Sequence, residues 1–324
     1  MHSAAEIVNA GPPTLEHVIG QKQAVEQLKV ALAAYFNERA AGRVGSLGAI
    51  LMVGPPGTGK SLLSRIIAAE LAATVKETLG QTLGLAEDLN ALLLEATDDT
   101  CVYIDEADLI PPAAQTKLFK AVEERVLIVP RGPRSRNETR IPLSKFTLIL
   151  STNHASGILA PLRERMSVVL HFDFYTQDEL AALCRQRSQA LRWTVEPEVF
   201  ALIAAKSKQT PRLAIRLLRS CWQTARATGA ETITADHFHR TLILEGLDAG
   251  LGLDKAEQTY LKALAEAGGK ARLHLLSSRL SQPTRTVSEV IESFLIRQNL
   301  VTRSESGREL TEKGFEYVRQ QYGL

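Results

Sequence analysis

One octapeptide constrains the fold of this chain more than any other feature does. It reads Gly54-Pro55-Pro56-Gly57-Thr58-Gly59-Lys60-Ser61 and fits the pattern G-x-x-x-x-G-K-[ST]. An apolar run from Ala49 to Val53 precedes it and predicts a buried strand, and apolar residues at helical spacing follow it up to Leu71. A strand, a glycine-rich loop and a helix form an anion site, because the loop amides and the helix N-terminus point at the same place. We therefore expect Lys60 to reach the β- and γ-phosphates of a nucleotide and Ser61 to bind Mg²⁺; a chance match is the alternative.

Helical and strand-like stretches alternate through the first half of the chain. Helices are predicted at 21–40, 60–72, 86–96 and 112–124, and strands at 47–53, 101–105, 146–151 and 168–174. The strands are apolar throughout, which is typical of strands buried on both faces. This alternation predicts an α/β fold with a parallel sheet that helices cover on both sides.

The pattern changes after residue 174. Only helical periodicity is visible from 175 to about 248, which indicates a small helical domain, and a glycine-rich step from Gly246 to Gly252 marks the next boundary. Three short helical stretches follow, and then two short strands around a turn at Ser304 to Gly307, the outline of a winged helix. We expect a flexible arm at 1–12, a large domain at 13–174, a helical lid domain at 175–250 and a winged-helix domain at 251–324.

Composition limits the partners and the compartment. The formal charge is only +2 over 324 residues, so any contact with nucleic acid must come from local patches. Cys101, Cys184 and Cys221 are far apart and form no C-x-x-C pair, which argues against disulfides or a zinc site. His237 and His239 would point apart on a helix and are expected to be structural. No apolar run is long enough to cross a membrane, so a cytoplasmic protein without a membrane partner is the expectation.

Two strand ends carry polar residues suited to nucleotide chemistry. Asp105 and Glu106 end the predicted strand at 101–105, at the edge where ligands of parallel sheets bind. We expect Asp105 to hold Mg²⁺ and Glu106 to activate the attacking water; a solvated helix start is the alternative. After the next strand, Asn153 is the first candidate and Thr152 the second for a contact with the γ-phosphate or the water, with a turn or cap role as the alternative.

Three arginines are candidates for contact with the phosphates. Arg163 and Arg165 lie in Pro161-Leu162-Arg163-Glu164-Arg165, just before the last predicted strand. Either could be an arginine finger, a cation supplied across a subunit boundary to the transferring phosphoryl group; pairing with surface carboxylates is the usual alternative. Arg212, in Thr210-Pro211-Arg212, would begin a helix of the small domain and could swing towards the phosphates.

In this order the motifs resemble those of the AAA+ ATPase family and, within it, the RuvB family of motors that drive Holliday-junction branch migration. The likeness runs from about residue 13 to 320 and includes Thr14 to Gln21, Phe146 to Ile149, Phe174 to Thr176 and Gly252 to Asp254. The resemblance implies a ring, usually a homo-hexamer, with ATP at the subunit boundaries and duplex or branched DNA through its centre. It implies that Tyr175 and the arm near Ile19 flank the adenine and that Arg212 is sensor 2. Either Arg163 or Arg165 would then act in the site of the neighbouring subunit.

Some positions near the nucleotide depart from the RuvB pattern. Where the family typically reads Asp-Glu-Ile-His, this chain reads Asp105-Glu106-Ala107-Asp108, and where the family reads Gly-Ala-Thr-Thr-Arg it reads Leu150-Ser151-Thr152-Asn153-His154. These changes keep polar groups near the γ-phosphate, so hydrolysis of ATP is still expected. Gly11-Pro12-Pro13 stands where an Arg-Pro usually precedes the Thr14 position, which weakens the expected contact of the arm with the nucleotide.

Two other departures bear on the macromolecular partner. Residues 125–145 would form the hairpin that contacts RuvA in the family, but here they hold six basic residues and one acidic residue. A solvated loop, phosphate contact and an acidic protein partner are the alternatives. The wing reads Ser304-Glu305-Ser306-Gly307-Arg308 instead of a basic Pro-Arg-Gly-Arg type. The candidate DNA contacts, against ordinary surface charge, are Arg285, Arg303 and Arg308.

We expect an ATP-dependent DNA motor of the RuvB type. The alternative is a RuvB-like paralogue that uses the same ATPase core on a protein partner, as a switch or a remodelling enzyme. The departures at the hairpin and the wing favour the alternative, and the predicted winged helix favours the motor.

Overall fold

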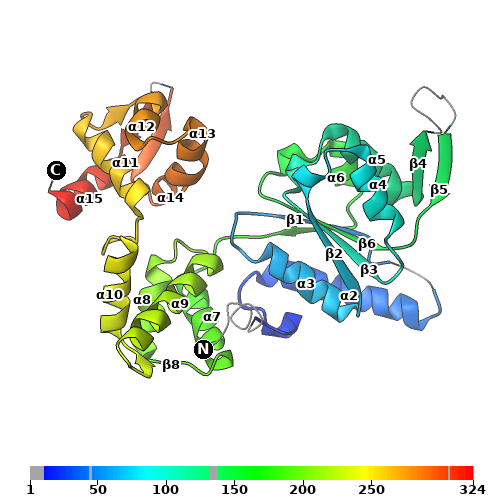
Figure 1. Ribbon diagram of the computed structural model, residues 1–324, viewed down its shortest axis with the longest axis horizontal. Coiled ribbons are helices and arrows are strands. Elements are labelled where there is room, and N and C mark those ends of the chain that lie inside the picture. The colour runs from blue at the N-terminus through cyan, green and yellow to red at the C-terminus, as the bar shows by residue number, and fades with distance from the viewer. Residues whose placement is uncertain (1–10, 44–45, 131–137, 306, 324) are drawn as a thin grey trace. The chain divides into compact units, whose positions relative to one another are not determined.

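The computed structural model describes residues 11–43, 46–130, 138–305 and 307–323 (Figure 1). The chain forms two compact units. The first consists of the residues up to Glu179 together with Thr210–Arg212, and the second of Leu180–Gln209 and the chain from Leu213 onward. Most of the predicted arm, residues 1–10, lies outside the described residues, as does the tip of the predicted hairpin at 131–137.

The first unit contains a sheet of five parallel strands in the order β2-β3-β6-β1-β7. The strands are β1 Ala49–Val53, β2 Thr74–Leu79, β3 Thr100–Asp105, β6 Thr147–Thr152 and β7 Val168–His171. The central strands are buried along nearly their whole length, as their apolar sequences predicted. In the register of this sheet Val53 pairs with Thr152, so the carboxyl ends of β1 and β6 lie side by side.

Helices cover both faces of this sheet, which confirms the predicted α/β architecture (Figure 1). The helices are α2 Lys22–Ala40, α3 Lys60–Glu70, α4 Ala86–Leu94, α5 Pro112–Glu124 and α6 Ala160–Glu164. Alternate residues of a strand face opposite sides. Leu51 accordingly packs in the core beneath α4, α5 and α6, whereas Ile50 and Met52 pack in the core beneath α2 and α3.

β2 was not predicted, because its sequence, TVKETL, carries charges and much of it is exposed. It lies at the edge of the sheet, where charged residues are common because they prevent pairing with other chains. The predicted hairpin is present as β4 Val126–Pro130 paired with β5 Glu138–Pro142.

The second unit begins with helices that confirm the predicted lid. They are α7 Gln177–Ala190, which starts in the first unit, α8 Pro197–Lys206, α9 Pro211–Ala227 and α10 Ala235–Glu245. Thr234 is the N-cap of α10. The expectation of helices alone was wrong, because β8 Thr194–Val195 and β9 Thr232–Ile233 form a short parallel pair. Two-residue strands leave no periodic signal in a sequence.

The rest of the second unit is a winged helix. Its helices are α11 Lys255–Glu266, α12 Leu273–Leu280, α13 Thr284–Thr286, a π-helical turn at Val287–Ile291, and α14 Glu292–Arg297. The hairpin of β11 Val301–Ser304 and β12 Gly307–Leu310 is joined by β10 Lys270–Ala271 into one sheet. A last helix, α15 Glu312–Tyr322, was not predicted; it packs on the common core through Val318.

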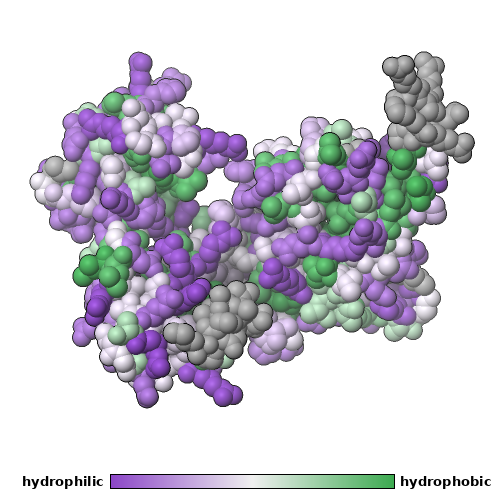
Figure 2. Space-filling model, viewed as in Figure 1, coloured by the Kyte–Doolittle hydropathy of each residue, from purple (hydrophilic) through white to green (hydrophobic). Residues whose placement is uncertain are grey.

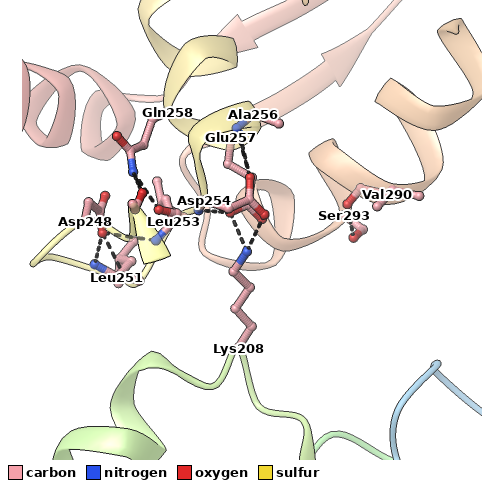
Figure 3. A network of polar contacts seen from close by, with 12 residues as sticks. Lys208, Asp248, Leu251, Leu253, Asp254, Ala256, Glu257, Gln258, Val290 and Ser293 are labelled. Atoms are coloured by element: carbon pink, nitrogen blue, oxygen red, sulfur yellow. Dashed lines mark hydrogen bonds and ion pairs between the residues drawn. The ribbon is translucent and has the colours of Figure 1, made fainter. Parts of the chain in front are cut away.

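An ion-pair network joins the turn after α8 to the start of α11 (Figure 3). The Nζ atom of Lys208 lies 2.5 Å from Oε2 of Glu257 and 3.1 Å from Oδ2 of Asp254. Asp254 also caps α11 by accepting from the N–H groups of Ala256 and Glu257. Burial raises the pKa of Glu257 to about 7, although the charge of Lys208 opposes that shift. The lid helices and the winged helix of this unit are therefore linked by a buried carboxylate and a lysine.

The surface of the described residues is mostly polar. Figure 2 shows hydrophilic side chains over much of the visible face, with apolar atoms gathered over α10. There Ile243 and Leu244 are 79% and 69% exposed. Within the described parts of the chain, none of the helices has the length and apolar character that a membrane span requires.

Candidate active site

The glycine-rich loop runs from the end of β1 to the start of α3. A Cβ atom at Gly54 would lie 2.3 Å from the carbonyl oxygen of Phe172, so only glycine fits there. The buried hydroxyl of Thr58 donates to the carbonyl of Pro55 at 2.8 Å and closes the loop on itself. Gly59, with φ of 106°, is the N-cap of α3. The loop is therefore preformed, and the N–H groups at the start of α3 face an anion site.

Lys60 folds back over this loop. Its Nζ donates to the carbonyls of Gly54 and Pro55, at 2.7 and 2.8 Å, and to Oδ1 of Asn153 at 2.9 Å. Burial lowers the pKa of Lys60 to about 8; Arg212 acts in the same direction. All three acceptors are neutral, and a phosphate oxygen would be a stronger one because hydrogen bonds between charged groups are stronger.

Ser61 and Asp105 converge at the carboxyl edge of the sheet. The Ser61 hydroxyl donates to Oδ2 of Asp105 at 3.3 Å. A hydroxyl and a carboxylate side by side are hard oxygen donors, and Mg²⁺ prefers one or two such protein ligands together with phosphate and water. The donor set therefore fits a magnesium ion. The described residues contain no group of three or more His, Cys, Asp or Glu side chains arranged for a metal, so any such ion would depend on other oxygens as well.

Glu106 follows Asp105 and is exposed at the same edge. Its backbone has φ of 52°, in the left-handed region, and its N–H donates to Oδ1 of Asp105 at 2.9 Å. A Cβ at Gly80 would lie only 2.2 Å from the carbonyl oxygen of Glu106. Gly80 thus determines where the Glu106 backbone can lie. No sequence pattern indicated this role, because Gly80 follows β2, the strand that was not predicted.

The two candidates at the end of β6 have different surroundings. Asn153 is exposed and accepts from Lys60, whereas Thr152 is only 1% exposed. The Thr152 hydroxyl donates to Oδ1 of Asp108 at 2.6 Å and accepts from the N–H of His154 at 2.8 Å. Thr152 therefore braces the turn that carries Asn153. Asp108, which stands where the family usually has histidine, is its partner in that brace.

Arg163 and Arg165 are both exposed near the end of α6. Arg163 donates to the carbonyl of Ala155 at 3.3 Å. Arg165 is held by two groups: it donates to Oε1 of Glu123 at 2.9 Å, and its guanidinium carbon lies 5.8 Å from the centre of the Phe119 ring. The Arg165 side chain keeps 49% of its surface exposed. Its guanidinium is oriented and still accessible.

Arg212 lies at the start of α9 and belongs to the first unit. Its backbone N–H donates to the carbonyl of Gly57 at 3.4 Å, and a Cβ at Gly57 would lie 3.1 Å from the Cβ of Arg212. The structure thus brings the predicted Arg212 against the phosphate-binding loop.

A small, mostly apolar pocket lies beside this loop. It is lined by Val18, Gln21, Thr58, Gly59, Leu62, Leu63, Ile66, Phe172 and Tyr175. The predicted Tyr175 is therefore in the pocket, and burial raises its pKa to about 12. The predicted Ile19 is half buried and lies in the sequence between Val18 and Gln21, two residues that line the pocket. Gln21 was not predicted; its side chain bonds both backbone groups of Asp173, at 2.7 and 3.0 Å.

The candidate DNA contacts of the winged helix are all paired with glutamates. Arg285 donates to Glu289 at 2.9 Å on the surface of the domain. Arg303 and Arg308 donate to opposite oxygens of Glu292, at 3.0 and 2.9 Å, and Glu292 is fully buried. The Arg303 side chain is 49% exposed but that of Arg308 only 17%. Of these two, Arg303 is the more accessible to a phosphate.

The predicted hairpin and the histidine pair are described in part. Arg140 pairs with Glu124 at 2.5 Å, and the basic residues at 131–137 lie outside the described residues. The Nδ1 atom of His237 lies 2.9 Å from the hydroxyl of Thr234, and Phe238 is buried. These contacts agree with a structural role for His237.

The fold and the loop geometry define an AAA+ type P-loop domain followed by a lid and a winged helix. Residues 10–172 match the Holliday junction DNA helicase RuvB P-loop domain, residues 175–248 the RuvB AAA lid domain, and residues 250–319 the RuvB C-terminal winged helix domain. The chain belongs to the RuvB family. The resemblance seen in the sequence is thereby confirmed, and the chain is a nucleotide-binding ATPase of this family.

Relatives match along nearly the whole chain. The Holliday junction branch migration complex subunit RuvB of Koribacter versatilis (strain Ellin345) is 34% identical over 312 residues, which cover 95% of this chain and 85% of the relative. The subunit of the same name from Wolbachia pipientis wMel is 32% identical and covers 97% of this chain and 95% of the relative. The solved structure of the Thermotoga maritima RuvB Holliday junction branch migration motor superposes with a TM-score of 0.82 at 29% identity, covering 96% of this chain and 98% of that one.

Proposed function

We propose that this protein is an ATP-driven motor that moves the branch point of Holliday junctions during DNA recombination and repair. The observation that carries the proposal is the meeting of Lys60 with Asn153, and of Ser61 with Asp105, at one edge of the sheet. The full set of domains named for RuvB supports the choice of DNA as the object that is moved. In this proposal residues 13–174 form the ATPase domain, 175–250 the lid and 251–324 the winged helix.

The phosphates of ATP would be held by the loop from Gly54 to Gly59, by Lys60 and by Arg212. The adenine would lie against Tyr175, with the arm around Ile19 and Gln21 on its other side. Ser61 and Asp105 would hold Mg²⁺, which neutralises phosphate charge when it is bound. The positions of Ser61 and Asp105 beside each other, and of Tyr175 and Gln21 in the pocket, support these assignments.

Glu106 would take a proton from the water that attacks the γ-phosphorus. The bond from that phosphorus to the bridging oxygen breaks, so ADP and phosphate leave. Asn153 is suited to detect the γ-phosphate because it already bonds Lys60. Thr152 would contribute by bracing this turn through Asp108.

We propose Arg165 as the residue that acts in a neighbouring subunit of a homo-hexameric ring. A finger works best when its guanidinium is oriented before the partner arrives, because less freedom is then lost. Glu123 and Phe119 hold Arg165 while half of it stays exposed. An exposed ion pair of this kind contributes at most about 1 kcal/mol, so Glu123 would not prevent Arg165 from reaching a phosphate. Arg163 is the second candidate.

The proposed DNA surface is the winged helix, with Arg303 as the main contact and Arg285 and Arg308 as lesser ones. A RuvA-like partner would bind at the hairpin of β4 and β5, although the sequence of its tip is basic. The three cysteines are buried and free, which suits a reducing compartment such as the cytoplasm.

The pairing of Arg285, Arg303 and Arg308 with glutamates favours a second candidate function. The same ATPase core could act on a protein partner instead of on DNA. Such a protein would hydrolyse ATP without any response to branched DNA.

The deciding experiment measures ATP hydrolysis and binding of a synthetic four-way junction. A motor should hydrolyse ATP faster with the junction, and its affinity for the junction should fall steeply between about 50 and 200 mM salt. It should also move the branch point only when ATP is present, and Lys60→Ala should abolish turnover. Normal hydrolysis without binding or migration of the junction would overturn the DNA motor and leave the protein-directed enzyme.

A further inference from the structure

A group of buried hydroxyls lies directly beneath Ser61 and Asp105. Tyr103 and Ser151 are both fully buried. Tyr103 stands two residues before Asp105 on β3, so both side chains point to the same face of the sheet, and Ser151 lies on the neighbouring strand β6. The Tyr103 hydroxyl lies 3.0 Å from Oγ of Ser61 and 2.9 Å from Oγ of Ser151. Ser151 in turn donates to Oδ1 of Asp105.

Packing alone does not require these hydroxyls. The Tyr103 ring lies in the apolar core between the sheet and α3, with Ile67 and Ile149, and phenylalanine would fill the same space. A buried hydroxyl costs stability unless it is hydrogen-bonded. The Tyr103 hydroxyl finds its partners in two serines that both donate to Asp105. Ser151 stands where the RuvB pattern described above usually has alanine.

The hydrogen bonds of the network converge on the two oxygens of Asp105. Tyr103 donates to Ser61, and both serines donate to Asp105, each to a different oxygen. The Tyr103 hydroxyl also lies within hydrogen-bonding distance of Ser151, where either atom could be the donor.

This arrangement leaves Ser61 able to bind a cation. Its Oγ accepts from Tyr103 and donates to Asp105, so one of the two lone pairs of the hydroxyl stays available. Tyr103 and Ser151 therefore determine where the oxygens of Ser61 and Asp105 lie.

We propose that Tyr103 and Ser151 are positioning residues for the Mg²⁺–nucleotide complex. Tyr103 donates to Ser61 and Ser151 donates to Asp105, and these two bonds hold the oxygens of Ser61 and Asp105 in place for the cation. This inference rests on the proposed function, because it assumes a nucleotide that binds with Mg²⁺. It assigns to two buried side chains a part in metal-dependent binding and none in contact with the nucleotide.

The test measures binding of a fluorescent ADP analogue to the full chain, first in excess EDTA and then as MgCl₂ is added. Tyr103→Phe keeps the ring and removes only the hydroxyl. We expect unchanged affinity in EDTA and an Mg²⁺ midpoint about three- to tenfold higher, the size of one hydrogen bond. Ser151→Ala should shift the midpoint in the same direction. The double variant should shift it by less than the product of the two single shifts, because both residues belong to one chain of hydrogen bonds.

Tyr35→Phe is the matched control. Tyr35 lies on α2, and its hydroxyl accepts from Arg39 at 2.9 Å, away from the loop. Its variant should keep the midpoint of the natural sequence. Thermal unfolding without ligand is a second measurement. If the two residues had only a structural role, the melting temperature of each variant would fall in proportion to its loss of binding.

Equal Mg²⁺ midpoints in the natural sequence and in Tyr103→Phe overturn the proposal. A loss of equal size in EDTA and in Mg²⁺ overturns it too, since that result indicates a structural role alone. If Tyr103→Phe does not fold, Ser151→Ala, which removes a single oxygen, decides by the same criteria. If the natural sequence itself does not bind the analogue with Mg²⁺, the proposed function fails, which is a different result from variants that match a competent natural protein.

Discussion

The Nζ atom of Lys60 lies 2.9 Å from Oδ1 of Asn153, and this bond joins the phosphate-binding loop to the end of β6. The two residues meet because β1 and β6 are neighbours in the sheet, with Val53 paired to Thr152. A substitution at Asn153 therefore removes a direct hydrogen bond to Lys60. Asn153 is placed to affect what happens to the phosphate after ATP has bound.

Replacement of Asn153 by alanine should slow hydrolysis and leave ATP binding nearly unchanged. The loop and Lys60 still hold the nucleotide, but one polar group near the γ-phosphate is lost, and such a loss typically costs about 100-fold in rate. Steady-state hydrolysis and nucleotide binding should be measured on the same preparation. Asn37→Ala, an exposed site on α2, is the control and should change neither quantity. A matching loss of affinity and rate in Asn153→Ala would contradict the assignment.

Nucleotide binding should weaken as the pH rises above about 8. The pKa of Lys60 is lowered to about 8 by burial, and a bound phosphate favours the charged lysine and raises that pKa again. Between the two values the complex holds a proton that the unbound protein has lost, so binding takes up a proton and loses affinity with increasing pH. Calorimetry at pH 9 in buffers of different ionisation enthalpy should detect this uptake. It should be absent at pH 6.5, where the lysine is charged in both states.

Arg165→Ala should retain nucleotide binding and lose about 1000-fold or more in hydrolysis. Mixing Arg165→Ala with Lys60→Ala tests whether the residue acts across a boundary. The first variant has an intact loop and the second an intact arginine, so a mixed assembly should regain activity at some of its sites. Arg163→Ala is the comparison and should retain most of its activity. The opposite ranking would make Arg163 the finger, and normal rates in both would exclude the shared site.

Lys208→Met should destabilise the second unit by about 3 kcal/mol at pH 8, because Glu257 is left buried and unpaired. The pKa of Glu257 in the folded protein is already raised to about 7. This group therefore contributes stability at pH values below its pKa in the unfolded chain, and that contribution is lost as the pH rises through 7. Without Lys208 the pKa rises further. The difference between the variant and the natural sequence should therefore shrink as the pH falls to 5.

Chemical denaturation at the two pH values measures this difference. Lys76→Met is the matched control, because Lys76 pairs with the exposed Glu95 at 2.6 Å and its loss should not change the stability measurably. Equal stability losses for the two variants at pH 8 would show that the buried pair contributes no more than a surface pair.

Arg308→Ala and Arg303→Ala should separate stability from DNA binding. Arg308 is mostly buried, and its removal takes away an ion-pair partner of the buried Glu292. The free energy of unfolding should therefore fall by about 2–4 kcal/mol. Arg303 is half exposed, and its removal should mainly lower the affinity for a four-way junction and reduce the salt dependence by about one charge. Unchanged junction affinity in Arg303→Ala would remove that residue from the proposed DNA surface.

The sequence predicted the sheet well because its strands are buried on both faces and therefore read as apolar runs. β2 was not predicted because it is an edge strand with Lys76 and Glu77 in its middle, and edge strands need no apolar pattern. The short pair of β8 and β9 was not predicted because two residues are too few to show the alternation of a strand. The last helix, α15, was not predicted because it follows the hairpin with which the expected winged-helix outline ends.

The candidate site was predictable where a motif names the residues in order, from Gly54 to Ser61 and at Asp105. It was less predictable where a role depends on contacts between distant segments. Nothing near Gln21 indicates that its amide binds Asp173, and nothing near Asp108 indicates that it braces Thr152. Pairing of Arg303 and Arg308 with one buried glutamate also needs three-dimensional information, since Glu292 is eleven and sixteen positions away.

Gly80 has a consequence for how this enzyme tolerates change. The peptide oxygen of Glu106 occupies the space that any side chain at position 80 would need. A methyl group added there would push on the backbone of Glu106, the proposed general base, before it disturbed the apolar core. Substitutions at the edge of a sheet are usually tolerated. At position 80, however, we expect a substitution to lower the rate of ATP hydrolysis in a protein that still folds.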